Sequence, residues 1–176
     1  MNVNIIRDKN VDLELYQEVI ELLQQTNGPL KFIGNENFSE LDDLPLTRVS
    51  LDEKKFNIKS SYMFSRSVSN NFPVERSIAK PNDLLKKCKD FRSQNDLGNN
   101  EFVVLLTEQA NSINWFSFFN SHKDSIIHTT DWGYFLGCNR LFPIAYEIIS
   151  NVYQMILFKS MDDLSNHYHK KSNLTL

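Results

Sequence analysis

The feature that most constrains the fold is an unbroken apolar run, FVVLL, at residues 102–106. A strand between a core and solvent alternates apolar and polar residues, because successive side chains point to opposite faces of a sheet. A strand that is apolar at every position must be covered on both faces. The run therefore predicts a central strand in a sheet with chain packed on either side.

The N-terminal part predicts a strand, a helix and a second strand in succession. Residues 3–7 (VNIIR) and 30–34 (LKFIG) are the two strand candidates. Between them, Asp12 can cap a helix that stops at the triplet NGP, residues 27–29. Its apolar stripe comprises Leu15, Val19, Leu22 and Leu23. Because a strand–helix–strand unit joins parallel strands, we expect a βαβ-like opening with a parallel pair.

The second half predicts two more helices and one more strand. Pro81 begins a helix whose inward residues are Leu84, Leu85, Cys88 and Phe91. Residues 125–130 (SIIHTT) form a strand candidate. Pro143 begins a helix over residues 143–158 that is apolar nearly all round, as a central helix would be.

Two segments give weaker patterns. Residues 111–120 (NSINWFSFFN) are aromatic and read as a half-buried loop or helical turn. Residues 35–81 are irregular, with one or two strands expected between Phe56 and Val68. Taken together, the patterns predict an α+β fold with a single domain at residues 1–160 and a polar C-terminal tail at 161–176 that frays.

The net charge and the cysteine residues limit which binding partners and which cellular location the sequence predicts. The formal net charge of −3 argues against nucleic-acid binding, which needs a basic surface. The one basic cluster lies within residues 86–92, and we expect it to be the solvated face of a helix. Cys88 and Cys138 lack metal-ligand spacing, which predicts reduced thiols and a cytoplasmic protein. A signal peptide and a membrane span of about eighteen apolar residues are not expected, so no membrane partner is predicted.

Two groupings of reactive side chains could carry chemistry. His128 and Asp131 could hold a metal ion, although the spacing indicates no third ligand. His128 and Cys138 could form a base and nucleophile for acyl transfer, although the flanking residues match no cysteine-protease signature. The structural alternatives are a hydrogen-bonded strand histidine and a buried thiol. His167 and His169 alternate in the polar tail and could hold a metal only adventitiously. Phosphate-binding glycine motifs do not occur, and we expect no cofactor.

Glu147 is the acid that interrupts the apolar helix at 143–158. A carboxylate in such a place is costly unless it is paired or hydrogen-bonded. Asn151 and Gln154 follow it at i+4 and i+7, so all three could share a narrow solvated face. A solvated acid and a functional carboxylate both remain open from the sequence.

Residues 101–132, followed by PIAYEIISNV at 143–152, resemble the core of zincin-like metalloproteases, the archaemetzincin type most closely. In such folds a central strand leads to an edge strand and then to the helix that carries H-E-x-x-H. Two histidines of that motif bind zinc, and the glutamate is the general base. Here the motif falls on YEIIS, so Glu147 matches, while Tyr146 and Ser150 replace the histidines.

The resemblance implies a zincin-like mixed sheet, with 143–158 as its central helix, that has lost its zinc. The N-terminal order of strand, helix and strand also agrees with that family. The third zinc ligand and the cysteine-rich part of archaemetzincins have no counterpart in residues 151–176. The chain then resembles a pseudoenzyme whose former cleft is lined by Trp132, Tyr134, Phe135, Tyr146 and Glu147.

These observations favour a non-catalytic binding or accessory subunit that acts through protein–protein interaction. We expect the strand at 125–130 and the helix at 143–158 to form the surface, with a peptide added beside an edge strand. One alternative is a cysteine- or metal-dependent hydrolase that uses Cys138, His128 and Asp131. Another is a small regulator of a phage or mobile element, since the Asn- and Lys-rich composition suits an AT-rich genome.

Overall fold

The computed structural model of the chain describes residues 1–35, 79–109, 111, 115–130, 132 and 139–172. Five strands make up its sheet: β1 (Asn2–Arg7), β2 (Lys31–Asn35), β3 (Phe102–Thr107), β4 (Ser117–Phe119) and β5 (Asp124–His128). Their order across the sheet is β2-β1-β3-β5-β4. All neighbours pair in parallel except β4, which runs antiparallel to β5 at one edge.

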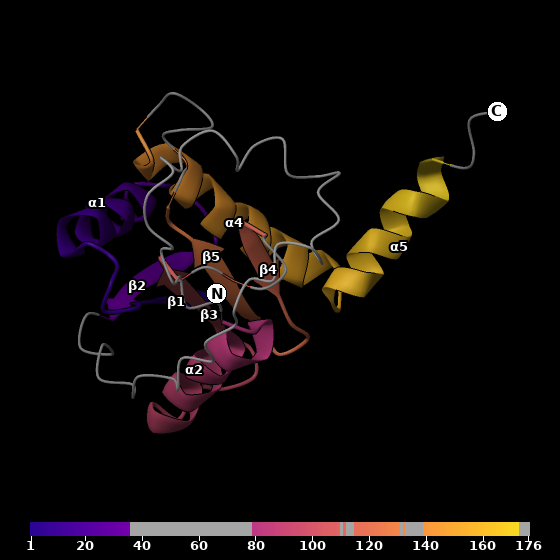
Figure 1. The fold of residues 1–176 in the computed structure, drawn as a ribbon, viewed down its shortest axis with the longest axis horizontal. Coiled ribbons are helices and arrows are strands. Elements are labelled where there is room, and N and C mark those ends of the chain that lie inside the picture. Colours follow the sequence, from indigo (N-terminus) through magenta and orange to yellow (C-terminus); the bar gives the residue numbers. More distant parts are fainter. Residues whose placement is uncertain (36–78, 110, 112–114, 131, 133–138, 173–176) are drawn as a thin grey trace, which may run out of the picture.

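Helices cover both faces of the sheet (Figure 1). They are α1 (Leu13–Gln24), α2 (Pro81–Gln94), α4 (Leu141–Leu157) and α5 (Met161–Ser172). Val104 and Leu106 of β3 pack in one hydrophobic cluster with α1 and α4. Val103 and Leu105 pack in a second cluster with α2. All six residues of β3 are buried, so the central strand predicted from the apolar run is confirmed.

The βαβ opening is confirmed as well, and Tyr16 holds it together. Asp12 caps α1 by accepting a hydrogen bond of 2.9 Å from the Leu15 backbone nitrogen. The Tyr16 hydroxyl donates to the Ile5 carbonyl at 2.8 Å and accepts from the Asn35 nitrogen at 2.6 Å, which connects α1 to β1 and β2. A Cβ at Gly34 would lie 3.2 Å from that hydroxyl, so the close approach favours glycine.

One sequence prediction differs from the fold. Residues 111–120 were expected to be a loop or helical turn, but Ser117–Phe119 form the edge strand β4. Three residues are too few to show the alternation that marks a strand. The strands expected between Phe56 and Val68 lie outside the described residues. An α+β fold with a mixed sheet is confirmed, and the predicted 143–158 helix begins two residues earlier, at Leu141.

The segment predicted to be a fraying polar tail contains α5, which projects away from the sheet (Figure 1). Ser160 Oγ accepts from the Asp163 nitrogen at 3.2 Å, and Asp163 accepts from the Lys159 nitrogen at 3.1 Å. This pair of contacts caps the start of the helix. Met161 and Leu164 pack against the core as partly buried residues, which explains why the helix stays attached.

A chain that ends at Ser160 should still unfold cooperatively, with a modestly lower melting temperature. Loss of the partly buried Met161 and Leu164 should cost about 1–2 kcal/mol. For a domain of this size that corresponds to a decrease of about 2–8 °C, measurable by differential scanning calorimetry. The full-length variant Leu164→Ser is the matched control and should show part of the decrease. An insoluble product, or a larger decrease, would mean that α5 is integral to the fold.

Candidate functional site at the edge of the sheet

Glu147 lies on the flank of α4 that faces β4, and two neutral side chains hydrogen-bond its carboxylate. Ser117 Oγ of β4 donates to Glu147 Oε2 at 2.8 Å, and Asn151 Nδ2 donates to the same oxygen at 3.2 Å. Glu147 is partly buried, so it is neither a core residue nor a fully solvated one. Among the described residues, no cation forms an ion pair with it.

A chain of hydrogen bonds runs from Glu147 into the core. Asn151 Nδ2 also donates to Ser117 Oγ at 3.0 Å and to the Glu147 carbonyl at 2.9 Å. Ser125 Oγ of β5 donates to Asn151 Oδ1 at 3.1 Å. Ser125 and Asn151 are 0% and 1% exposed, so these polar groups are satisfied by one another rather than by solvent. This series of hydrogen bonds fixes the position of α4 against both β5 and the edge strand β4.

The outer edge of β4 carries backbone groups that point away from the sheet. Phe118 pairs with Ile126, and the flanking ladder bonds join Phe116 to His128 and Asn120 to Asp124. In an antiparallel pair, the residues between such bonds direct their N–H and C=O groups outward. Those residues are Ser117 and Phe119. No described strand pairs with β4 on that side, so the edge can accept another strand.

Tyr146 and Ser150, which the resemblance aligns with the two motif histidines, share an open face of α4. Tyr146 is 67% exposed and Ser150 is partly buried. Both line a shallow groove of about 460 Å³ that continues past Tyr153 and Leu157 to His167 on α5. Tyr153 and Leu157 are themselves 45% and 71% exposed. The groove is therefore bounded by exposed apolar and aromatic side chains, with the polar side chains of Ser150 and Gln154 between them.

Trp132 supports the site from inside. Its side chain is 8% exposed, its Nε1 donates to the His128 carbonyl at 2.7 Å, and its ring centroid lies 4.6 Å from that of Phe116. Phe116 and Trp115, just before β4, are 40% and 48% exposed. Trp132 thus holds Phe116 in place beside the open edge. The other two predicted cleft residues, Tyr134 and Phe135, lie outside the described residues.

Of the three residues of the hydrolase alternative, the structure describes only His128. His128 ends β5, and its Nδ1 is hydrogen-bonded to Thr130 Oγ1 at 2.8 Å. Asp131 and Cys138, its predicted partners, lie outside the described residues. Within the part of the chain that is described, no three His, Cys, Asp or Glu side chains gather closely enough to hold a metal ion.

A buried ion pair that the sequence analysis missed lies at the carboxyl ends of β1 and β3. Asp8 Oδ2 accepts from Lys87 Nζ at 3.0 Å and from Thr107 Oγ1 at 3.1 Å. The crossovers from β1 and into β3 run over opposite faces of the sheet, which makes this end a switch point where ligands of open α/β sheets bind. Here Lys87 of α2 occupies the position and pairs with the carboxylate, so the arrangement is structural.

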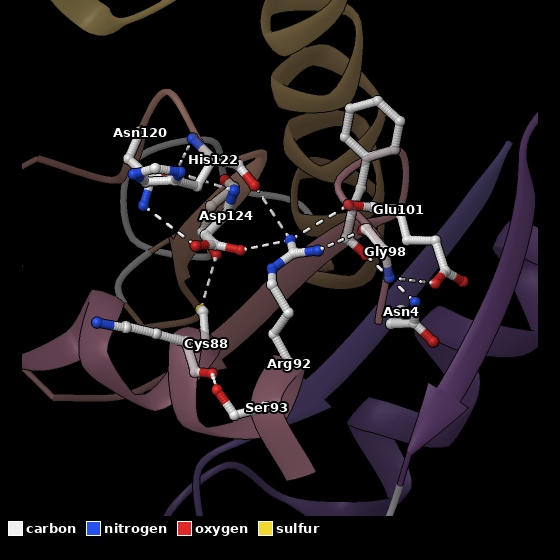
Figure 2. Close-up of polar contacts among 12 residues, drawn as sticks. Asn4, Cys88, Arg92, Ser93, Gly98, Glu101, Asn120, His122 and Asp124 are labelled. Carbon is white, nitrogen blue, oxygen red and sulfur yellow. Dashed lines mark hydrogen bonds and ion pairs between the residues drawn. The ribbon is translucent and has the colours of Figure 1, made fainter. Parts of the chain in front are cut away.

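A second ion pair lies at the opposite, amino ends of β3 and β5 (Figure 2). Arg92 Nη2 donates to Asp124 Oδ1 at 2.7 Å, to the His122 carbonyl at 3.1 Å and to the Glu101 carbonyl at 3.2 Å. Its Nη1 donates to the Gly98 carbonyl at 2.9 Å. Figure 2 shows the guanidinium group between the aspartate and the loop before β3, so Arg92 joins α2 to both strands.

The basic cluster was therefore only partly predicted. Lys86 and Lys89 are exposed, as expected for a solvated face, but Lys87 and Arg92 turn inward to buried carboxylates. Cys88, between them, is 0% exposed, and burial raises the pKa of its thiol well above the ordinary value. A neutral buried thiol is unreactive, in agreement with the prediction that Cys88 packs as a small hydrophobic residue.

Comparisons with known proteins find no relative. No family model matches the chain, and no curated protein or solved structure matches it. Within the described residues, no single helix has the length and apolar character to cross a membrane, and only α4 and part of α5 together, across a bend of 82°, would meet both criteria.

Proposed function

We propose that the chain is a non-catalytic, zincin-like binding or accessory subunit that acts through protein–protein interaction. An extended segment of the partner protein adds to the outer edge of β4, beside α4. The observation that carries the proposal is the outer edge of β4, with which no described strand pairs, together with the half-buried Glu147 and the exposed aromatic residues Trp115 and Phe116 next to it. The proposal includes a cytoplasmic location and involves no cofactor.

The order of elements supports the zincin-like part of the proposal. The central strand β3 is followed by the edge strand β4, then by β5, and then by α4, which carries YEIIS. The resemblance implies a central strand, an edge strand and then the helix, and the chain has these three in that order, with β5 between the edge strand and the helix. Tyr146 and Ser150 lie on one open face of α4, and Glu147 lies on the flank towards β4.

The chemistry of the site favours binding over catalysis. The resemblance aligns Tyr146 and Ser150 with the two imidazole ligands of a zincin, and neither residue type forms the zinc-binding pair of that motif. Glu147 Oε2 is occupied by two neutral donors, Ser117 and Asn151. A carboxylate so held is positioned as a fixed acceptor rather than as a base that waits for a metal-bound water.

The surface differs in one element from the one expected from the sequence. The strand at 125–130 was expected to form part of the interaction surface, but β5 pairs with β3 on one side and with β4 on the other. Its backbone groups are therefore engaged within the sheet. The edge position belongs to β4, and addition of a partner strand there would give affinity through main-chain hydrogen bonds, with side-chain positions giving specificity.

A comparison of Ser117→Pro with Ser117→Ala tests the proposed function. Both variants lose the hydroxyl that bonds Glu147, but only proline also removes the outward N–H of the edge. Each tagged variant and the parent should be used to capture partners from extracts of the native host. We expect a specific protein to be retained by the parent and by Ser117→Ala and lost with Ser117→Pro. Equal capture by the proline variant, or no specific protein with the parent, would contradict the proposal.

The zincin-like scaffold can be tested by restoring the motif with Tyr146→His and Ser150→His. Both positions border the groove, so imidazoles there stand one turn apart without entering the core. Water must complete the coordination, and we expect micromolar binding. With free zinc at ten times the dissociation constant, the gain is about 1.4 kcal/mol, or roughly 3–6 °C in melting temperature.

The control for the restored motif is each single variant, which offers one imidazole and should gain nothing from zinc. Thermal melts with zinc and with a chelator provide the measurement. A folded double variant that melts at the same temperature with and without zinc would show that residues 146 and 150 do not face a common site.

A further inference from the structure

We infer that Glu147 selects a basic side chain, Lys or Arg, in the partner segment that adds to β4. The inference rests on the proposed function and names the chemistry of the partner. The evidence for this inference is separate from the evidence for strand addition, because it concerns the charge of Glu147 beside β4 rather than the backbone groups of β4.

Among the described residues, the Glu147 carboxylate has only neutral hydrogen-bond donors. Its two donors, Ser117 Oγ and Asn151 Nδ2, are neutral and both reach Oε2. Oε1 receives no hydrogen bond from the described residues, and no described cation pairs with the carboxylate. By contrast, the buried carboxylates Asp8 and Asp124 each have a cation of their own. A half-buried carboxylate with a vacant oxygen binds an ammonium or guanidinium group better than any neutral group.

The register of strand addition places a partner side chain within reach of that oxygen. Ser117 directs its backbone groups outward and its side chain towards α4, where Oγ lies 2.8 Å from Glu147 Oε2. Residues paired across two strands share a face, with Cβ atoms about 4.5–5.5 Å apart. The partner residue opposite Ser117 therefore projects over the α4 side, next to the carboxylate. A long Lys or Arg side chain spans the remaining gap.

The neighbours of that basic residue should be apolar. Successive residues of the partner strand alternate faces, so the residues before and after it lie on the side of Phe118, which packs in the α2 cluster. β-branched and aromatic residues fit that half-buried position. The predicted recognition pattern is thus one basic residue between two residues of high strand propensity. An acidic residue at the central position would be repelled.

The test uses a displayed library of random 12-residue peptides, selected on the unaltered full chain, on Glu147→Gln and on Glu147→Lys. Gln keeps an acceptor for Ser117 and Asn151 but has no charge. We expect the unaltered chain to select the pattern above, and its best peptide to bind Glu147→Gln about 10- to 100-fold more weakly, the range for loss of a charged hydrogen bond. The Lys variant should select acidic residues at the same position.

Two measurements on the ligand side keep the test decisive even if a variant folds poorly. A peptide in which the selected Lys is replaced by norleucine loses only the ammonium group and should bind the unaltered chain as weakly as the parent peptide binds Glu147→Gln. N-methylation of alternate peptide amides should abolish binding, and methylation of the intervening amides should not.

The outcomes separate the two claims. If the N-methylation pattern is alternating but norleucine and Glu147→Gln leave affinity unchanged, the inference about Glu147 is wrong and the proposed function stands. If no peptide is selected, or if methylation shows no alternation, strand addition itself is wrong.

Discussion

Replacing Asp8 by Ala should reduce the free energy of unfolding by about 3–5 kcal/mol, because it leaves the ammonium group of Lys87 buried without its partner. Both side chains of the pair are only 10% exposed, so water cannot solvate the orphaned charge. Thr107 Oγ1 also loses its acceptor. Urea denaturation monitored by circular dichroism measures the change.

The matched control for Asp8 removes both charges. The double variant Asp8→Ala and Lys87→Met should recover much of the lost stability, since a buried ion pair replaced by apolar groups is often close to neutral. If Asp8→Ala alone costs less than about 1 kcal/mol, the pair is solvated and the buried arrangement is incorrect.

Replacing Arg92 by Ala should cost a similar amount, again about 3–5 kcal/mol, because it leaves the buried carboxylate of Asp124 without its cation. Asp124 is 2% exposed and would keep only its contacts with Asn120. The substitution also removes the donors to the carbonyls of Gly98 and Glu101, which hold the loop before β3.

Asp124→Ala is the comparison for Arg92→Ala. It should cost less, since Arg92 would keep the three carbonyl acceptors of Gly98, Glu101 and His122. Arg92→Lys should lie between the two, because a single ammonium group cannot reach both the carboxylate and the loop. Chemical denaturation of the three variants gives the order, and a reversed order would show that the aspartate, not the arginine, organises this end of the sheet.

The elements predicted well from the sequence are those whose determinants are local. The central strand β3 follows from five consecutive apolar residues, and α1 follows from a cap at Asp12 and an apolar stripe. The edge strand β4 was missed because three residues carry no periodicity. The helix α5, which Ser160 and Asp163 cap, was missed because the polar composition of residues 161–176 suggested a frayed tail.

The charged residues that turn inward could not be identified from the sequence. Lys87 pairs with a residue 79 positions away and Arg92 with one 32 positions away, so nothing near them in the chain separates them from the solvated Lys86 and Lys89. Glu147 could be singled out because an acid contrasts with an apolar helix. Its contact with Ser117 could not, because that contact depends on the missed strand β4.

The most direct test of the central claim is amide hydrogen exchange at β4, compared between the chain alone and the chain bound to a selected peptide. The N–H of Phe118 is bonded within the sheet and should exchange slowly in both states, while those of Ser117 and Phe119 face outward. We predict that the N–H groups of Ser117 and Phe119 exchange faster than that of Phe118 in the chain alone and become protected in the complex. A bound peptide that leaves the exchange of Ser117 and Phe119 unchanged would contradict the assignment of this edge as the binding surface.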